Sequence, residues 1–67
     1  MRISYDREVD ALYIRFKEGS VTTQHIIDGI AVDYDAEGKL SGIEVLDAAK
    51  RLGTTEALEK VTFEEAL

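Results

Sequence analysis

Apolar and polar side chains alternate along most of residues 1–46, and a period of two is typical of half-buried β-strands. The clearest case is the run Ala-Leu-Tyr-Ile-Arg-Phe-Lys at 11–17, in which every second side chain is apolar. Strands are predicted at about 2–5, 11–17, 21–27, 30–35 and 39–46.

Stretches rich in charged residues and glycine separate these runs. Asp28-Gly29 favours a two-residue type I′ turn, which needs a positive φ at both central positions. Asp35-Ala-Glu-Gly38 suits a hairpin loop with Gly38 in the left-handed conformation. The chain should therefore fold as successive hairpins.

The alternation ends after Leu46, and helix-forming residues follow. Asp47 could cap a first helix through its carboxylate, and Gly53 could end it. Short helices are predicted at about 47–52, 55–60 and 62–66. The apolar side chains that could dock this tail are Leu52, Leu58, Val61, Phe63 and Leu67.

The predicted fold class is α+β, with residues 1–67 in a single domain. Residues 1–46 form an antiparallel β-meander of about five strands. The helical tail, residues 47–67, covers one face of that sheet. Sheet edges carry unpaired backbone groups, so pairing of two edges is an economical route to a dimer.

Length and composition limit how this domain is stabilised. A chain of 67 residues buries only about 60% of the surface that its unfolded form exposes. The sequence has no cysteine, which excludes disulfides and thiolate metal sites and fits a reducing cytoplasm. Self-association as a homodimer or higher homo-oligomer, or binding to another protein, is the expected supplement.

The net charge of −6 narrows the choice of partner. Residues 1–17 carry four basic and three acidic groups, whereas residues 18–67 carry four basic and eleven acidic ones, a net of −7. The acidic part repels nucleic acid and anionic lipid and attracts a basic protein. No signal peptide or membrane span is expected, and a cytoplasmic location follows.

The acidic stretch 33–44 allows two interpretations that exclude each other. Asp33, Asp35, Glu37 and Glu44 stand at calcium-loop offsets around Gly38, so a divalent-cation module is one alternative. The residues before them are β-branched, however, and would make a poor entering helix. We favour a metal-free hairpin whose turn and rim are acidic.

No catalytic or cofactor-binding motif is visible. His25 is the single histidine, and no serine lies in a recognisable nucleophile motif. A non-enzymatic protein without cofactors is expected, and a small enzyme with a site formed between subunits is the alternative. The residues proposed for an interface are aromatic or apolar: Tyr5, Tyr13, Tyr34, Leu58 and Phe63.

Two long blocks of sequence resemble a known family. Tyr5-Asp-Arg-Glu-Val-Asp-Ala-Leu-Tyr-Ile14 is the first block, and Asp28-Gly-Ile-Ala-Val-Asp-Tyr-Asp-Ala-Glu-Gly-Lys-Leu-Ser-Gly-Ile-Glu-Val-Leu-Asp-Ala48 is the second. Together they resemble the prokaryotic domain-of-unknown-function family 2283 over about residues 1–52. The resemblance implies small proteins with no assigned activity, some of them candidate antitoxin partners of basic RelE-like toxins. It transfers no functional residue to this chain.

Overall fold

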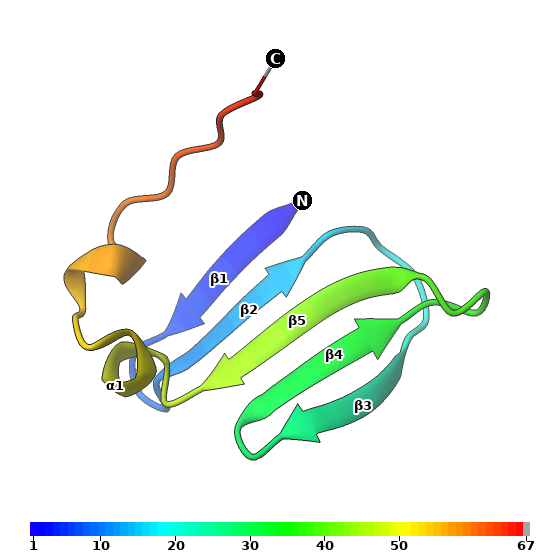
Figure 1. Cartoon of the computed structure of the whole chain (residues 1–67), viewed down its shortest axis with the longest axis horizontal. Coiled ribbons are helices and arrows are strands. Elements are labelled where there is room, and N and C mark those ends of the chain that lie inside the picture. The colour runs from blue at the N-terminus through cyan, green and yellow to red at the C-terminus, as the bar shows by residue number, and fades with distance from the viewer. Residues whose placement is uncertain (67) are drawn as a thin grey trace.

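The computed structural model describes residues 1–66, so Leu67, one of the proposed tail anchors, lies outside the described residues. The chain forms a five-stranded antiparallel sheet followed by a short helix and a 3₁₀ turn (Figure 1). The strands are β1 (Arg2–Asp6), β2 (Ala11–Arg15), β3 (Thr22–Ile27), β4 (Ile30–Tyr34) and β5 (Leu40–Leu46). They are followed by α1 (Ala48–Leu52) and the 3₁₀ turn η1 (Glu56–Leu58). The α+β class and the five predicted strands are confirmed.

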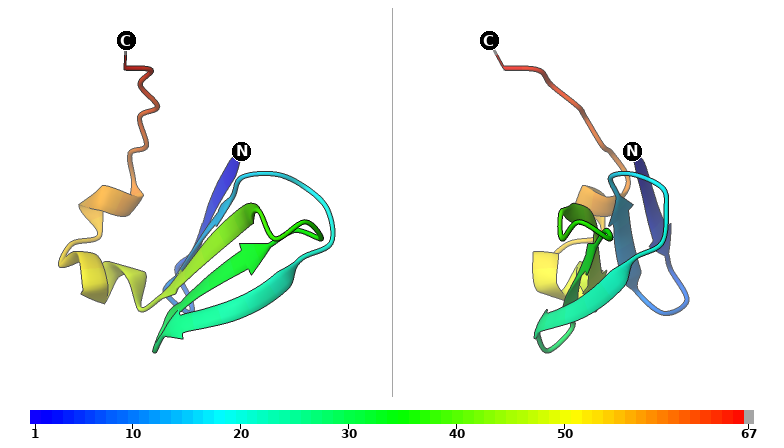
Figure 2. Two further views of the ribbon diagram at one scale, coloured as in Figure 1. Left: turned by 45° about the vertical axis from the view of Figure 1, so that its right-hand side comes forward. Right: turned by 90° about the vertical axis from the view of Figure 1, so that its right-hand side faces the viewer.

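The order of the strands departs from a simple meander at one point. The sheet runs β1-β2-β5-β4-β3, so β5 lies between β2 and β4. The connection after β2 passes the end of the sheet and starts β3 at the far edge (Figures 1 and 2). This order gives the long apolar strand β5 two neighbours and leaves the polar Thr-Thr-Gln-His run of β3 at an edge, where unpaired backbone groups remain solvated.

The turn between β3 and β4 is not the expected type I′ turn. Gly29 has a φ of 85°, but Asp28 is not among the residues with positive φ. A register shift between His25 and Ile27 precedes the turn and accommodates its different backbone geometry. The loop between β4 and β5 follows the prediction: Gly38 has a φ of 78°, and Asp35 accepts hydrogen bonds from the N–H groups of Glu37 and Lys39.

The helical tail differs most from the prediction. Helix α1 forms, but the segment predicted at 55–60 contains only the single 3₁₀ turn η1, and residues 62–66 contain no helix. A single helical turn fixes several dihedrals for one hydrogen bond, so it forms only where packing supports it. The tail also covers much less of the sheet than predicted: Leu52, Leu58 and Val61 lie only against the β1–β2 part of one face, and the chain then leaves the body (Figures 1 and 2).

Helix α1 is capped by a residue far away in sequence. The side chain of Asp47 makes no capping hydrogen bond, so that prediction was wrong. Asp10, in the turn between β1 and β2, takes this role. Its carbonyl accepts from the N–H of Ala48 at 3.0 Å, and its Oδ1 accepts from the N–H of Ala49 at 2.9 Å. The hydroxyl of Tyr5 donates to the same Oδ1, which joins the first hairpin to the start of the helix.

No helix in the part of the chain described here has the length and hydrophobicity needed to cross a membrane.

Candidate functional site

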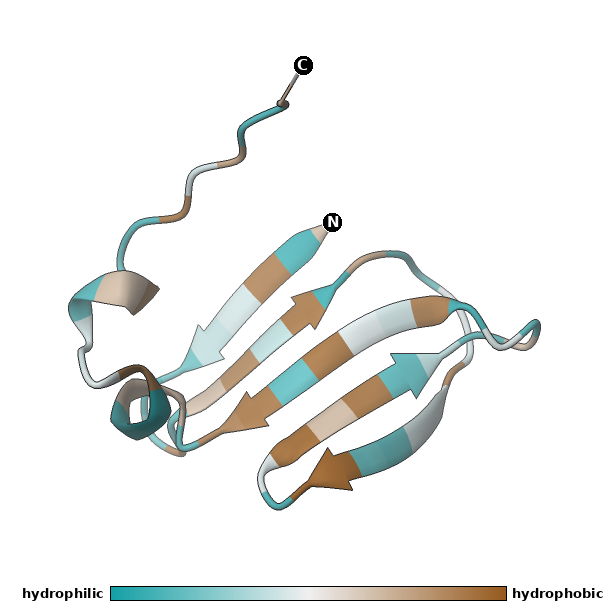
Figure 3. Ribbon diagram, in the orientation of Figure 1, coloured by the Kyte–Doolittle hydropathy of each residue, from teal (hydrophilic) through white to brown (hydrophobic). Residues whose placement is uncertain are grey.

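Two rows of apolar side chains cross one face of the sheet, which we call the apolar face. The strand register places Ile3, Ile14, Ile43 and Val32 opposite one another in sequence across β1, β2, β5 and β4. A second row contains Tyr5, Leu12, Val45, Ile30 and Ile27. Figure 3 shows the alternation along the strands that produces these rows. The apolar face therefore crosses β1, β2, β5 and β4 and reaches β3 only at Ile27, because Gln24 lies opposite Val32.

Nothing in the described chain covers most of this face. Among the described residues, the only buried hydrophobic side chains are Ala31 and Ala48, and both are small. Ile3 is 42% exposed, and Ile27 is 56% exposed. The other seven side chains of the two rows are half-buried. Side chains that should form the core of a small domain thus remain in partial contact with water.

The total accessible surface leads to the same conclusion. It is 5346 Å² for a chain of 7.5 kDa. A compact monomer of this mass has about 4,200 Å². The difference of roughly 1,100 Å² reflects the open sheet face and the extended tail.

A groove lies where the tail meets the apolar face. It has a volume of about 370 Å³, and Ile3, Leu12 and Ile14 form its floor on the sheet. Leu52, Leu58 and Val61 form the opposite wall. Leu58 is half-buried there, so this proposed interface residue faces the groove. Tyr5 and Ala57 complete the lining, which is mainly apolar.

The opposite face, the polar face, contains a hydrogen-bonded network centred on Asp33. The hydroxyl of Tyr13 on β2 donates to Oδ2 of Asp33 at 2.5 Å, and Thr23 on β3 donates to Oδ1 at 2.6 Å. Asp33 is only 8% exposed. Gly42 on β5 lies between Tyr13 and Asp33, and its missing side chain lets the tyrosine lie across the strand.

The pKa shifts in this network follow from its hydrogen bonds. The hydrogen bonds from Thr23 and then Tyr13 lower the pKa of Asp33. The hydrogen bond to Asp33 raises the pKa of Tyr13. General acid–base catalysis needs a pKa near the working pH, and both of these shifts move away from neutrality.

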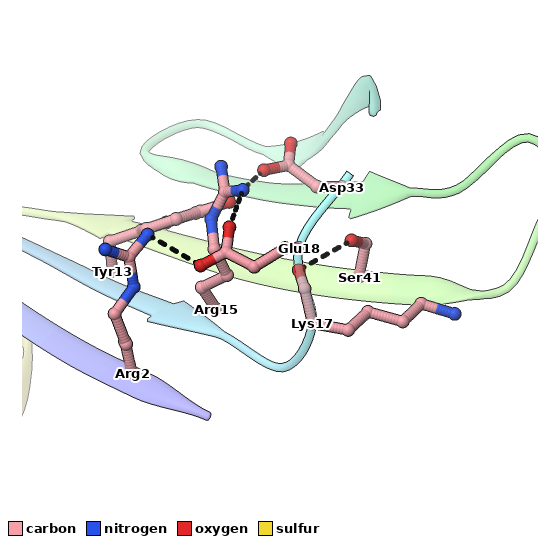
Figure 4. A network of polar contacts seen from close by, with 7 residues as sticks. All are labelled: Arg2, Tyr13, Arg15, Lys17, Glu18, Asp33 and Ser41. Carbon is pink, nitrogen blue, oxygen red and sulfur yellow. Dashed lines mark hydrogen bonds and ion pairs between the residues drawn. The ribbon is translucent and has the colours of Figure 1, made fainter. Parts of the chain in front are cut away.

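Ion pairs line the rim of the polar face. Glu18 bridges Arg2 and Arg15, with N–O distances of 3.1 and 3.0 Å (Figure 4). Lys17 pairs with Asp35. The pairs around Glu18 are largely exposed, and such pairs contribute little to stability.

The four acidic residues of the proposed calcium loop lie in different surroundings. Asp33 is held by Tyr13 and Thr23, whereas Asp35 binds the backbone of its own turn. Glu37 is exposed at the tip of that turn, and Glu44 lines the same hollow of the polar face as Asp33. Strand β4, not a helix, leads into the loop. Within residues 1–66, no group of three or more acidic, histidine or cysteine side chains is arranged to hold a metal ion.

The remaining proposed site residues are dispersed. Tyr5 lies on the apolar face with its hydroxyl bonded to Asp10, and Tyr13 belongs to the polar network. Tyr34 is half-buried at the end of β4. Phe63 is 82% exposed on the tail. His25 is exposed on the edge strand β3, opposite Ala31.

The structural roles of two residues, Asp10 and Gly42, were not predicted from the sequence. Asp10 was not among the predicted helix caps. Its φ of 54° lies in the left-handed region, which aspartate tolerates better than most residues do. Gly42 lies inside the strand predicted at 39–46, and no special role was predicted for it. A glycine inside a strand is a recognised signal for close approach of another group, and it could have indicated the Tyr13 crossing.

Comparison with known proteins gives a family and one relative. Residues 2–48 match the family described as "Protein of unknown function (DUF2283)". An uncharacterized protein of Methanocaldococcus jannaschii is 39% identical over 51 residues, which cover 75% of this chain and 43% of that protein. The chain thus matches less than half the length of this relative. No solved structure matches the chain significantly.

Proposed function

The chain belongs to the DUF2283 family of unknown function, and we propose that it is a non-enzymatic, self-associating module whose apolar face packs on the same face of a second copy. The observation that carries this proposal is the pair of apolar rows that no described part of the chain covers. A two-fold axis makes such a face self-complementary, because each row then meets its own counterpart.

The exposed area is large enough for a stable dimer if the tail takes part. The excess of roughly 1,100 Å² per chain comes from the sheet face and the tail together, so two copies that bury both remove about 2,200 Å² from water. Permanent homodimers typically bury 2,000 Å² or more, and their interfaces resemble a domain core cut in half. Two sheets packed about 10 Å apart would form the core that the single chain lacks.

Sedimentation equilibrium and thermal melting test this proposal. The wild-type chain should sediment as a dimer, and its melting temperature should rise with protein concentration, because association stabilises only the folded state. Ile43→Asp, at the centre of the apolar face, should abolish the dimer. Glu44→Gln, on the same strand but facing the other side, is the matched control and should leave it intact.

A wild-type chain that sediments as a monomer at every concentration, with a constant melting temperature, would contradict the proposal. If Ile43→Asp does not fold, the concentration dependence of the wild-type melting temperature still decides the question.

Binding of a basic protein in the cytoplasm is a second proposed function, of the antitoxin-like kind. It is supported by the net charge of −7 on residues 18–67 and by the absence of cysteine. Complementary charge accelerates association and selects the partner. Calorimetric titration with a basic toxin-like protein encoded beside this gene should give binding that weakens as salt is added. No heat of binding at low salt would exclude that partner.

A further inference from the structure

The end of the described chain is extended and exposes two large apolar side chains. Val61 is 63% exposed and Phe63 is 82% exposed. Exposed apolar area of this size is unfavourable in water unless a surface receives it.

The groove beside β1 has the size and chemistry to receive a phenyl ring. Its volume is about 370 Å³, and it is lined by aliphatic side chains and by Tyr5. An apolar cavity of about 150 Å³ suffices for a benzene ring. The groove continues directly into the apolar face, because Ile3, Leu12 and Ile14 belong to both.

The sequence of the tail disfavours docking into the groove of its own chain. Val61 already lines that groove from the tail side, and Phe63 lies two residues further along a segment that leaves the body (Figures 1 and 2). To bring Phe63 back, the chain would have to reverse within a few residues. Residues 54–66 contain no glycine, proline, asparagine or aspartate, which are the residues that make tight reversals.

Charge favours a first hairpin as the receiving surface, and the lack of turn-forming residues in the tail is what selects the hairpin of another copy. Residues 54–66 carry four acidic groups and one basic group, a net of −3. Residues 1–17, which supply the groove floor, carry a net of +1. Within the chain, Glu59 already pairs with Arg7 at 3.8 Å, which is an example of this attraction.

We propose that Phe63 of one copy inserts into the groove of a second copy, and that the second copy returns the same contact. This exchange rests on the proposed self-association, and it identifies the tail that bears Phe63 as the segment that completes the dimer interface. Phe63 would then fill the groove, which is the part of the apolar face that the tail already borders. The tail of each copy would lie against the sheet of the other.

Engineered cysteines test the exchange cleanly, because the natural chain has none. An isotopically labelled Ile3→Cys chain is mixed with an unlabelled Phe63→Cys chain and oxidised gently. Most of the protein should form a disulfide-linked pair of one labelled and one unlabelled chain. Mass spectrometry of the digest should then identify a cross-linked peptide that contains residue 3 of one chain and residue 63 of the other. Ser4→Cys, one residue along β1, replaces Ile3→Cys as the control and should give little of this product.

The double variant Ile3→Cys/Phe63→Cys separates the alternatives. An intramolecular disulfide in a single chain, with no linked pair in the mixture, would overturn the proposal and assign the groove to the chain's own tail. Absence of any link between residues 3 and 63 would overturn it as well. If sedimentation still shows a dimer in these cases, only the exchange fails; if no dimer exists, the proposed self-association fails first.

Discussion

Tyr13 on β2 reaches across strand β5 to donate a hydrogen bond to Asp33 on β4, with 2.5 Å between the two oxygens. The contact is possible because residue 42, between them, is glycine. A Cβ at this position would lie 2.7 Å from the hydroxyl oxygen of Tyr13 and 3.0 Å from the carbonyl oxygen of Ile14. Thr23 extends the connection to β3, so the network joins three strands, β2, β3 and β4, and passes over a fourth, β5.

Replacing Gly42 should break this network. The added methyl group of Gly42→Ala displaces the tyrosine, and overpacking of this kind destabilises proteins by about 1–3 kcal/mol. Urea unfolding at a fixed protein concentration measures the change. In a Tyr13→Phe background the same substitution should be less damaging, because the hydroxyl contact is already absent. Equal losses in both backgrounds would show that Tyr13 is not the group displaced.

Removing the hydroxyl of Tyr13 should weaken the fold without disrupting its packing. Tyr13→Phe leaves the buried carboxylate of Asp33 with Thr23 as its remaining side-chain donor, and loss of a hydrogen bond to a charged group typically costs about 1–3 kcal/mol. The free energy of unfolding measures this loss. Tyr34→Phe is the matched control, since no hydrogen bond of its hydroxyl contributes to this network, and a loss as large as that of Tyr13→Phe would refute the assigned role.

Stability should fall in acid. Hydrogen bonds lower the pKa of Asp33, through Thr23 and Tyr13, and that of Asp10, through Tyr5 and Ala49. The unfolded carboxyls titrate near pH 3.9, so below about pH 5 the unfolded state binds more protons than the folded state. Their contribution is therefore complete above that range and is lost as the pH falls through the lowered values.

Urea unfolding between about pH 6 and pH 3 measures this dependence. Asp33→Asn should unfold with a shallower pH dependence than the wild-type chain. An identical slope for both would mean that Asp33 does not contribute.

The alkaline side should show the opposite sign. Hydrogen bonds to Asp10 and Asp33 raise the pKa of Tyr5 and Tyr13, respectively. Their stabilising contribution is complete below the ordinary tyrosine value of about 10 and disappears as the pH rises through the raised values. Near-ultraviolet titration of tyrosinate should show two ionisations at higher pH in the folded chain than in denaturant. Tyr13→Phe should remove one of them.

The tie between Asp10 and helix α1 should control the order of the helix. Asp10→Ala removes the acceptor of the Ala49 N–H and of the Tyr5 hydroxyl. Hydrogen exchange at Ala49 should then become faster, because the first turn of the helix loses its cap. Asp47→Gly is the control, since the side chain of Asp47 makes no cap bond and glycine tolerates its φ of 53°. Faster exchange in the control alone would assign the cap to Asp47 instead.

Calcium should leave the melting temperature unchanged. Asp33 and Asp35 already bind neighbouring side chains and backbone, so the acidic loop would have to break these contacts to coordinate an ion. Thermal melting with and without millimolar calcium checks this expectation, with magnesium as the control cation. A calcium-specific rise of several degrees would support the divalent-cation alternative.

The sequence by itself determined the strands, because a side-chain period of two and turn-forming residues such as Gly38 act locally. It also determined that one face of the sheet is apolar, since each strand carries that alternation. It indicated where helix α1 ends, because Gly53 with a φ of 76° suits a left-handed stop.

The tertiary structure decided what depends on partners distant in sequence. The position of β5 between β2 and β4, the capping of α1 by Asp10 and the crossing of Tyr13 over Gly42 all join segments that local patterns treat separately. The absence of a helix at 62–66 has the same origin, because a segment so short folds only against a surface, and its own chain does not supply one. Local propensity therefore specified the elements, and long-range packing and hydrogen bonding specified how they meet and which face remains open.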